Sequence, residues 1–230
     1  RLYIFDIPKK FFKKFQNVYT INPKIIIDNF TKNKKDISII PSLRNPKYSK
    51  LFGSKYLILD RNILFKYLIW KIYKPKYQHD FVILTGGSFQ MSEMVYSNLI
   101  ELSKKKKLVF ILGPFVKSSI KDSLKKNRIN FFTNPKNYFD IILNAKSVIT
   151  RFGNSVHETI ALKKKPSIFL YKDDQNRKKD INYLIKQGFA DYFNCQKLIK
   201  LSKTSNPKKL KNMSFGAKNV ISIIKHYYKK

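Results

Sequence analysis

The feature that most constrains this chain of 230 residues is a regular alternation that begins near residue 81 and continues to about residue 188. Short apolar runs such as FVIL and LVFIL alternate with longer polar segments that have helical spacing. Short apolar strands separated by amphipathic helices are typical of a parallel sheet that is covered by helices on both faces. The sequence therefore predicts an α/β fold with a Rossmann-like doubly wound parallel sheet.

The elements of this pattern can be given by residue range. Strands are expected at 81–84, 108–113, 129–133, 147–150 and 167–171, and helices at 90–104, 117–127, 135–144, 154–163 and 177–187. Upstream, we expect strands at 23–29, 37–40 and within 53–60, and a helix at 62–73. The tail, 207–228, is expected to be mostly helical.

The order of these elements suggests a division into domains. Residues 1–73 are interpreted as the C-terminal part of an N-terminal α/β domain, which we expect to be incomplete because the chain starts directly in a strand-like run. The polar segment 74–80, KPKYQHD, is the predicted interdomain linker. A second α/β domain is predicted for 81–205, followed by a C-terminal helix at 206–230.

Composition narrows the function classes. The net charge of +34 favours an anionic partner, such as nucleic acid, lipid headgroups or a phosphorylated small molecule, although A/T-rich coding also explains many lysines. No nucleic-acid-binding motif is found in the sequence, so specific nucleic-acid binding is not predicted. The single cysteine excludes a disulfide framework, and the three histidines have no metal spacing. We expect no metal and no cofactor, and a cytoplasmic protein with peripheral contact to an anionic inner membrane face as a further candidate.

In a doubly wound sheet, ligands bind at the carboxyl ends of the strands. This rule selects the loops 85–89, 113–117, 133–137 and 150–155. In the first loop, Gly86 and Gly87 permit a tight turn beside Ser88, and the following helix directs free N–H groups at the loop, which suits phosphate. Such a turn also occurs without a ligand, and no Walker motif follows it.

The loop 150–155 leads into a helix through Gly153, which allows close approach of a ligand. Asn154 or Ser155 is expected to cap the helix. Glu158 lies three or four residues after this cap, so it either points toward the mouth of the site, where it accepts hydrogen bonds from sugar hydroxyls, or serves as a capping-box partner. Arg151 is suited to bind a phosphate through its guanidinium group, or it is a surface residue without a ligand.

Two further features complete the set of candidate residues. Asp174 and Gln175 follow the strand at 167–171 and are suited either to sugar hydroxyls or to a polar helix start. His157 neighbours Glu158 but faces another direction on the helix, so we expect a rim or surface residue. No catalytic Ser/His/Asp or Cys/His set can be assembled, and the catalytic residues stay unassigned.

Together these loops resemble the C-terminal half of GT-B nucleotide-sugar enzymes. The segments ILTGGS, SVITRFGNSVHETIALKKKPSIFL, DDQ and LIKQGFADYF are similar in order and spacing to the peptidoglycan N-acetylglucosaminyltransferase (glycosyltransferase family 28) and to the UDP-sugar hydrolase of pseudaminic acid biosynthesis, which is related to spore-coat polysaccharide glycosyltransferases. The stretches PKIIIDNFTKNKKDISIIPSL and LFGSKYLILDRNIL resemble the hydrolase. The resemblance covers about residues 23–193. It implies a GT-B fold in which 81–205 form the nucleotide-sugar-binding domain.

The resemblance also implies roles for residues. In these families the Gly-Gly-Ser loop and the Ser/Thr-x-x-Gly-x-Ser/Thr-x-x-Glu motif bind UDP. Carried over, the loop 86–88 and the turn 153–155 would lie near the diphosphate, and Glu158 would hold the ribose hydroxyls. The loop from Asn134 to Tyr138 would recognise uracil, and Asp174 and Gln175 would approach the sugar.

Two departures accompany the resemblance. Arg151 and Phe152 are larger than the small residues that the families carry in this loop. The N-terminal Gly-x-Gly-His-x-x-Arg segment, which carries the catalytic histidine of the hydrolase, is not found in these residues. We therefore expect a UDP-sugar-binding enzyme of surface polysaccharide biosynthesis, a glycosyltransferase or UDP-sugar hydrolase, represented mainly by its donor-binding half. The alternative is a non-catalytic basic module that binds anionic membrane or nucleic acid.

Overall fold

The structure is a computed structural model. It describes residues 3–5, 24–27, 37–40, 51–52, 57, 59–60, 62–73, 76–87, 91–171, 174, 177–200 and 216–228. The predicted site residues Ser88 and Gln175 lie outside the described residues. The chain divides into two compact units, residues 1–59 with 210–230 and residues 60–209.

The first unit contains a parallel sheet of four strands in the order β1-β2-β3-β4. These are β1 (Tyr3–Phe5), β2 (Lys24–Ile27), β3 (Ile37–Ile40) and β4 (Leu51–Phe52). The helix α9 (Ala217–Tyr228) belongs to the same unit. The strand expected within 53–60 is not found at residues 57, 59 and 60, which have no regular structure. The preceding β4 takes its place beside β3, and residues 53–56 and 58 are not described.

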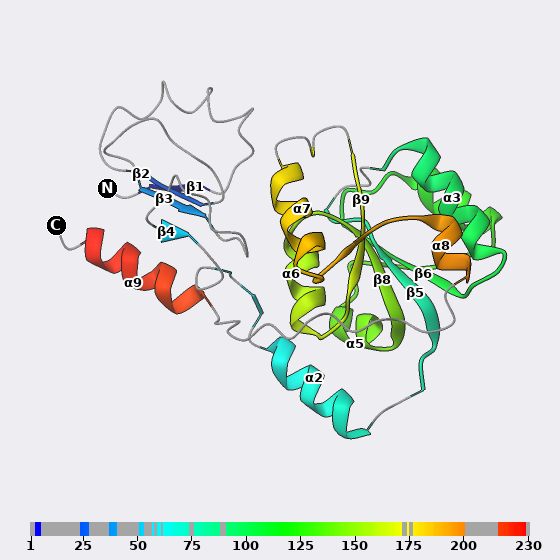
Figure 1. Ribbon diagram of the computed structural model, residues 1–230, viewed down its shortest axis with the longest axis horizontal. Coiled ribbons are helices and arrows are strands. Elements are labelled where there is room, and N and C mark those ends of the chain that lie inside the picture. The colour runs from blue at the N-terminus through cyan, green and yellow to red at the C-terminus, as the bar shows by residue number, and fades with distance from the viewer. Residues whose placement is uncertain are drawn as a thin grey trace. The chain divides into compact units, whose positions relative to one another are not determined.

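The second unit is built on a six-stranded, all-parallel sheet in the order β10-β9-β8-β5-β6-β7 (Figure 1). Its strands are β5 (His79–Leu84), β6 (Leu108–Leu112), β7 (Asn130–Thr133), β8 (Ala145–Arg151), β9 (Pro166–Phe169) and β10 (Asp191–Tyr192). The first and fourth strands of this unit, β5 and β8, are neighbours, so the strand order reverses between them. This is the Rossmann order, and the reversal marks where ligands bind in such sheets.

Helices cover both faces of this sheet. The helices α3 (Glu93–Ser103), α4 (Ser118–Lys126) and α8 (Cys195–Lys200) share one core with the sheet, while α5 (Tyr138–Leu143), α6 (Asn154–Ala161) and α7 (Lys178–Lys186) cover the other face (Figure 1). All five residues of β6 and the last four of β5 are buried. A strand buried on both sides must be apolar along its whole length, which explains runs such as LVFIL.

The predicted fold class is confirmed, and most predicted elements agree with the structure to within a few residues. The helix α2 (Asn62–Tyr73) has the predicted bounds. The short elements β10 and α8 were not predicted, because two and six residues provide too little periodicity to read. For the predicted helical tail, only α9 and the turn at residue 216 are described.

The compact units divide after residue 59 and not within the predicted linker 74–80. The reason is that α2 packs against α5 and α6 and so joins the second unit. His79 and Asp80, the last two residues of the predicted linker, already form the start of β5. Within the described part of the chain, none of the helices is both long enough and apolar enough to cross a membrane.

Candidate functional site at the carboxyl edge of the six-stranded sheet

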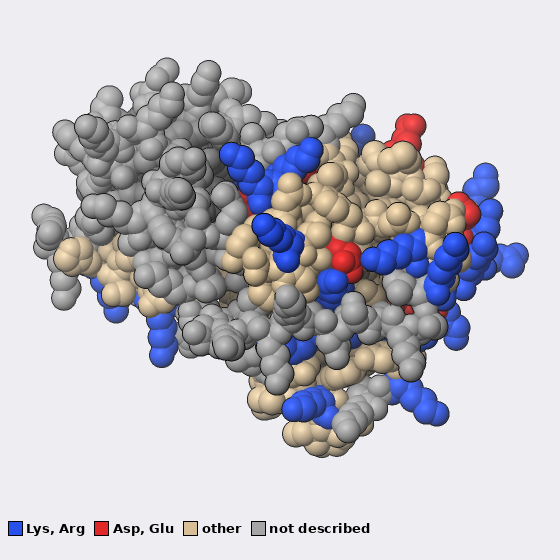
Figure 2. All heavy atoms as spheres, viewed as in Figure 1, with Lys and Arg blue, Asp and Glu red and all other residues tan. Residues whose placement is uncertain are grey.

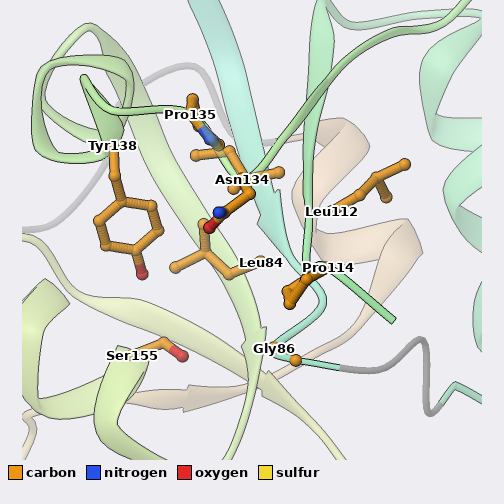
Figure 3. A pocket seen from close by; sticks show the side chains of 11 residues that line it. Leu84, Gly86, Leu112, Pro114, Asn134, Pro135, Tyr138 and Ser155 are labelled. Atoms are coloured by element: carbon orange, nitrogen blue, oxygen red, sulfur yellow. The ribbon is translucent and has the colours of Figure 1, made fainter. Parts of the chain in front are cut away.

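The four predicted loops meet around a cavity of about 250 Å³ at the carboxyl edge of the sheet. Figure 3 shows the hydroxyl groups of Tyr138 and Ser155 and the side-chain amide of Asn134 directed toward the same space, with Gly86 at its lower end. Each loop contributes lining residues: Leu84, Gly86, Gly87, Ile111, Leu112, Gly113, Pro114, Asn134, Pro135, Tyr138 and Ser155. The sequence therefore identified the loops that form this cavity.

The base of the cavity is formed by two glycine turns that touch through their backbones. Gly86 has φ +70°, a left-handed conformation that suits glycine. A Cβ atom on Gly113 would lie 2.0 Å from the carbonyl oxygen of Gly86 and 2.6 Å from Cα of Gly87. The Phe115 N–H donates to the carbonyl of Gly87 at 3.1 Å, which ties the turns together. Gly113 is therefore required by the close approach, a role that is not evident from the sequence.

The loop after β7 is held by a backbone hydrogen bond. Asn134 has φ 47°, a left-handed conformation in which asparagine is enriched. Its N–H donates to the carbonyl of Leu112 at 2.9 Å. The chain then turns into α5, whose first residue is Tyr138. The loop thus presents an amide, a proline ring and a phenol to the cavity.

The helix α6 begins beside the cavity without a side-chain cap. Its N-cap residue is Gly153, and Asn154 and Ser155 are the first two helical residues. The prediction that Asn154 or Ser155 caps the helix is therefore wrong, because the chain becomes helical one residue earlier than a cap at either position requires. The first N–H groups of a helix have no partner within it, and the positive end of the helix dipole adds to their attraction for an anion.

Glu158 lies one turn further along α6 and is half-buried. The Tyr138 hydroxyl donates a hydrogen bond to its Oε2 atom at 3.1 Å. A capping-box partner would occupy the third helical position, whereas Glu158 is the fifth, so this interpretation is excluded. Burial raises the pKa of Glu158, and the charge of Asp60 raises it further, while the hydrogen bond from Tyr138 lowers it. The pKa of Tyr138 is also raised, by burial and by the Glu158 carboxylate.

A second cavity, of about 500 Å³, shares Tyr138 with the first. It lies between the start of α2, the start of α5 and α6. Its lining combines two carboxylates, two lysines and three aromatic rings: Asp60, Asn62, Phe65, Lys66, Lys136, Tyr138, Phe139 and Glu158. Asp60, Asn62, Phe65 and Lys66 were not predicted as site residues, because they are far from α6 in sequence and only packing brings them beside it.

Asp174 does not line either cavity. Its side chain is buried and accepts hydrogen bonds from Nε and Nη2 of Arg151 at 2.8–3.1 Å, and from the Tyr171 N–H at 2.8 Å. The Arg151 guanidinium also stacks on the Tyr171 ring, 5.2 Å from its centroid. Arg151 and Asp174 thus hold the ends of β8 and β9 together in this structure.

His157 is buried, with 5% of its surface exposed, so the expectation of a rim residue is wrong. It packs edge-on against Phe152, with ring centroids 5.9 Å apart. Burial lowers its pKa to about 4, and nearby Arg177 acts in the same direction, against the opposing effect of Asp180. His157 and Glu158 can differ in this way because adjacent helical positions differ in direction by about 100°.

Of the predicted binding residues, five line the first cavity: Gly86, Gly87, Asn134, Tyr138 and Ser155. Glu158 lines the second. Gly153 and Asn154 form the start of α6 without lining either cavity. Among the described residues, no group of three or more His, Cys, Asp or Glu side chains is arranged to hold a metal ion.

Comparison with solved structures gives the wider class of this fold. The S. aureus MnaA–UDP co-structure is similar with 14% sequence identity and a TM-score of 0.53, covering 99% of this chain and 75% of that one. The Methanocaldococcus jannaschii UDP-GlcNAc 2-epimerase in complex with UDP-GlcNAc and UDP is similar with 15% identity and a TM-score of 0.51, covering 94% and 78%.

No protein-family model matches the sequence, and no curated protein matches it either. At 14–15% identity the structural similarity establishes the fold and not the activity. The chain has a Rossmann-like α/β fold of the GT-B type. The titles of both similar structures name UDP, and that of the second also names UDP-GlcNAc.

Proposed function

We propose that this chain is a nucleotide-sugar enzyme that binds a UDP-sugar at the carboxyl edge of the six-stranded sheet. The observation that carries the proposal is the convergence of a glycine turn, a helix start without a side-chain cap and a half-buried carboxylate around two cavities that share Tyr138. Each part offers the chemistry that one part of such a ligand requires. The two similar structures, whose titles name UDP, support the choice of nucleotide.

The diphosphate is assigned to the space between Gly86, Gly87 and the start of α6. Backbone N–H groups and the positive end of a helix dipole bind phosphate without a metal ion. The hydroxyl of Ser155 adds a donor at the same position. Gly153 contributes by leaving open space, because a Cβ atom built on it meets no atom within 4 Å.

The nucleoside is assigned to the side of Asn134, Pro135 and Tyr138. The ribose hydroxyls would donate to Glu158 in place of the Tyr138 hydroxyl, which now occupies its Oε2 atom. The carboxylate accepts two hydrogen bonds from neighbouring hydroxyl groups, a charge-assisted pairing. Asp174, which we predicted to approach the sugar, is engaged with Arg151, and its part in sugar binding stays a proposal that Gln175 shares.

Both candidate reactions break the bond between the anomeric carbon of the sugar and the diphosphate oxygen. In a hydrolase, water attacks this carbon and UDP leaves; in a glycosyltransferase, an acceptor hydroxyl attacks and UDP leaves in the same way. The backbone N–H groups at the two turns would stabilise the negative charge that develops on the leaving diphosphate. An epimerase, the activity that one of the similar structures carries in its title, would return a UDP-sugar with altered stereochemistry.

Calorimetric titration of the chain with UDP and with UDP-N-acetylglucosamine tests the proposal. We expect saturable binding of both, with a stoichiometry of one. Absence of binding at millimolar ligand would overturn it, and salt-sensitive binding of DNA in the same preparation would favour the basic module instead.

Proton NMR of UDP-N-acetylglucosamine incubated with the protein separates the candidate reactions. Release of UDP with free sugar indicates a hydrolase, release only with an added acceptor indicates a transferase, and a new UDP-sugar without UDP release indicates an epimerase. Binding without any of these changes would leave a binding protein and contradict the enzyme assignment.

A further inference from the structure

The helix α2 carries apolar side chains on two opposite sides. On one side Ile63 is buried and Trp70 is half-buried, with its ring stacked on that of Tyr67 at 6.4 Å. On the other side five large apolar residues are exposed, and we call them the α2 stripe: Phe65 (62% exposed), Leu68 (54%), Ile69 (37%), Ile72 (75%) and Tyr73 (78%). A helix that only covers a core would have polar residues on its outer side.

The spacing places all five residues on one face. At 100° per residue, positions 65, 68, 69, 72 and 73 fall within an arc of about 140°. Contiguous exposed apolar surface of this kind marks an interaction site in most proteins, whereas single exposed apolar residues need no explanation. The helix lies at the edge of the second unit (Figure 1), and the described side chains at its place in Figure 2 are tan and blue.

Lysines border the stripe on both sides. Lys66 lies about 20° beyond Tyr73 on the helix surface and Lys71 about 60° beyond Leu68 on the opposite side. Lys71 is exposed, and Lys66 is partly exposed and also pairs with Asp140 at 2.8 Å. After the helix ends, the exposed Lys76 and Tyr77 continue the same composition.

The lysines that border the α2 stripe favour an anionic lipid surface over a second copy of the chain. Two copies packed stripe to stripe would bring the bordering lysines of both copies together, within molecules that each carry a net charge of +34. An anionic lipid surface meets both features at once. The apolar side chains enter the boundary between headgroups and acyl chains, and the lysines reach the phosphates while their aliphatic stems stay on the apolar side. Tyrosine is suited to the same depth.

We propose that the α2 stripe is a membrane-docking surface that binds the headgroup region of an anionic bilayer. The helix lies in the plane of the surface and does not cross it. Phe65 and Lys66 also line the second cavity, whereas Ile72, the residue changed in the tests below, lines neither cavity. Each proposal can therefore fail without the other.

Co-sedimentation of the full chain with lipid vesicles tests the proposal. One set contains phosphatidylcholine with about one third phosphatidylglycerol, and the other phosphatidylcholine alone. We expect strong binding to the first set, at least about tenfold weaker binding to the second, and a decrease with salt. Ile72→Gln should weaken binding to the anionic set by roughly tenfold, as expected when one large apolar side chain no longer enters the lipid.

Met94→Gln is the matched control. Met94 is 72% exposed on α3, so the change removes a similar exposed apolar side chain outside the stripe. Vesicle binding of this variant should equal that of the wild type. Equal effects of the two substitutions would overturn the proposal, because binding would then depend on general surface composition.

Tryptophan fluorescence provides a second, local measurement. Trp70 is the single tryptophan of the sequence, so Trp70→Phe with Ile72→Trp moves the only reporter onto the stripe. We expect its emission to shift to shorter wavelength on addition of anionic vesicles, whereas Trp70→Phe with Met94→Trp should show no shift. No shift in either would overturn the proposal.

Two other outcomes would assign the stripe to another occupant and overturn the proposal. If sedimentation equilibrium shows a dimer that Ile72→Gln dissociates, and vesicles do not bind, the occupant is a second copy. If vesicles do not bind and Ile72→Gln lowers the free energy of unfolding of a monomer, the stripe is covered by the chain itself.

Discussion

Glu158 stands out at the residue scale, because this chain has only 14 acidic residues and places one of them, half-buried, beside two cavities. Its carboxylate accepts a hydrogen bond from Tyr138 and has Asp60 nearby. Both burial and a like charge disfavour ionisation, so the ionised carboxylate costs stability at neutral pH. Such a cost is typical of a group that is kept for binding.

Glu158→Gln should therefore change two properties in opposite directions. The amide is neutral and still accepts a hydrogen bond from Tyr138, so we expect a higher free energy of unfolding at neutral pH. UDP affinity should fall by about 1–3 kcal/mol, because a charged acceptor is lost. Chemical denaturation and calorimetry measure the two quantities.

The pH dependence supplies the control for this variant. Because the folded-state pKa of Glu158 is raised, the folded chain holds more protons than the unfolded chain between the two pKa values. The free energy of unfolding then falls as pH rises through this window in the wild type, and this contribution is absent in Glu158→Gln. A loss of both stability and affinity would instead indicate a structural role for Glu158.

At the scale of elements, the site depends on how closely loops from separate strands approach one another. The turns after β5 and β6 contact through backbone atoms, and only the missing side chain of Gly113 permits this. By contrast, a Cβ on Gly87 meets only Phe115, at 4.0 Å, which is ordinary contact. These two glycines look alike in the sequence and have different physical roles.

Gly113→Ala should lower the free energy of unfolding by at least about 2 kcal/mol, because backbone must move to admit the methyl group. Gly87→Ala is the control and should change stability by less than about 1 kcal/mol. Urea denaturation of the two variants gives the comparison. Equal stabilities would show that the turns separate easily and do not form a rigid base for the cavity.

A buried lysine connects α2 to the rest of the second unit. Lys164 donates to the carbonyl of Ala145 at 2.5 Å, and its Nζ lies 5.3 Å from the ring centroid of Trp70 and 4.9 Å from that of Tyr77. Burial lowers the pKa of Lys164 from 10.5 to about 8. The contact therefore joins the inner side of α2 to the segment between α6 and β9.

The lowered pKa of Lys164 predicts a pH dependence of the free energy of unfolding, which Lys164→Met should remove. Between pH 8 and 10.5 Lys164 is protonated to a greater extent in the unfolded chain than in the folded chain. The free energy of unfolding therefore increases as pH rises through this range. The difference between wild type and variant should grow in favour of the wild type over this range, in denaturation curves at several pH values. A constant difference would mean that Lys164 titrates near its ordinary pKa in the folded protein.

At the scale of the whole molecule, the chain has 48 basic and only 14 acidic residues. The described face in Figure 2 carries Lys and Arg over much of its surface, with Asp and Glu at few places. Repulsion among these charges opposes the compact state, while the same field attracts anionic ligands. Added salt should therefore raise the free energy of unfolding and lower the affinity for anionic ligands.

Raising NaCl from about 0.01 to about 0.1 M, which shortens the Debye length from about 30 to about 10 Å, should increase the free energy of unfolding. UDP affinity should fall over the same range. Thermal denaturation and calorimetry at matched pH measure the two trends. Stability that falls with added salt would indicate that attractive ion pairs, such as Lys146 with Asp80, outweigh repulsion.

The sequence by itself determined the parallel α/β fold, the helix at 62–73 and the four loops at the carboxyl edge. These depend on local periodicity and on a general rule for the ends of strands, so no knowledge of packing was needed. Glu158 was singled out by its position after the turn at 153–155 and Tyr138 through a resemblance, and the hydrogen bond between them became visible only in the structure.

Only the tertiary structure decided what each candidate side chain touches. Packing buried His157, paired Asp174 with Arg151 and left α6 without a side-chain cap. It also brought Asp60, Asn62, Phe65 and Lys66 to a cavity beside Glu158. The physical reason is that these contacts join residues far apart in the chain or depend on a helix starting one residue earlier. A periodic pattern specifies which face of an element is apolar, whereas partners, caps and cavities depend on how the elements come together.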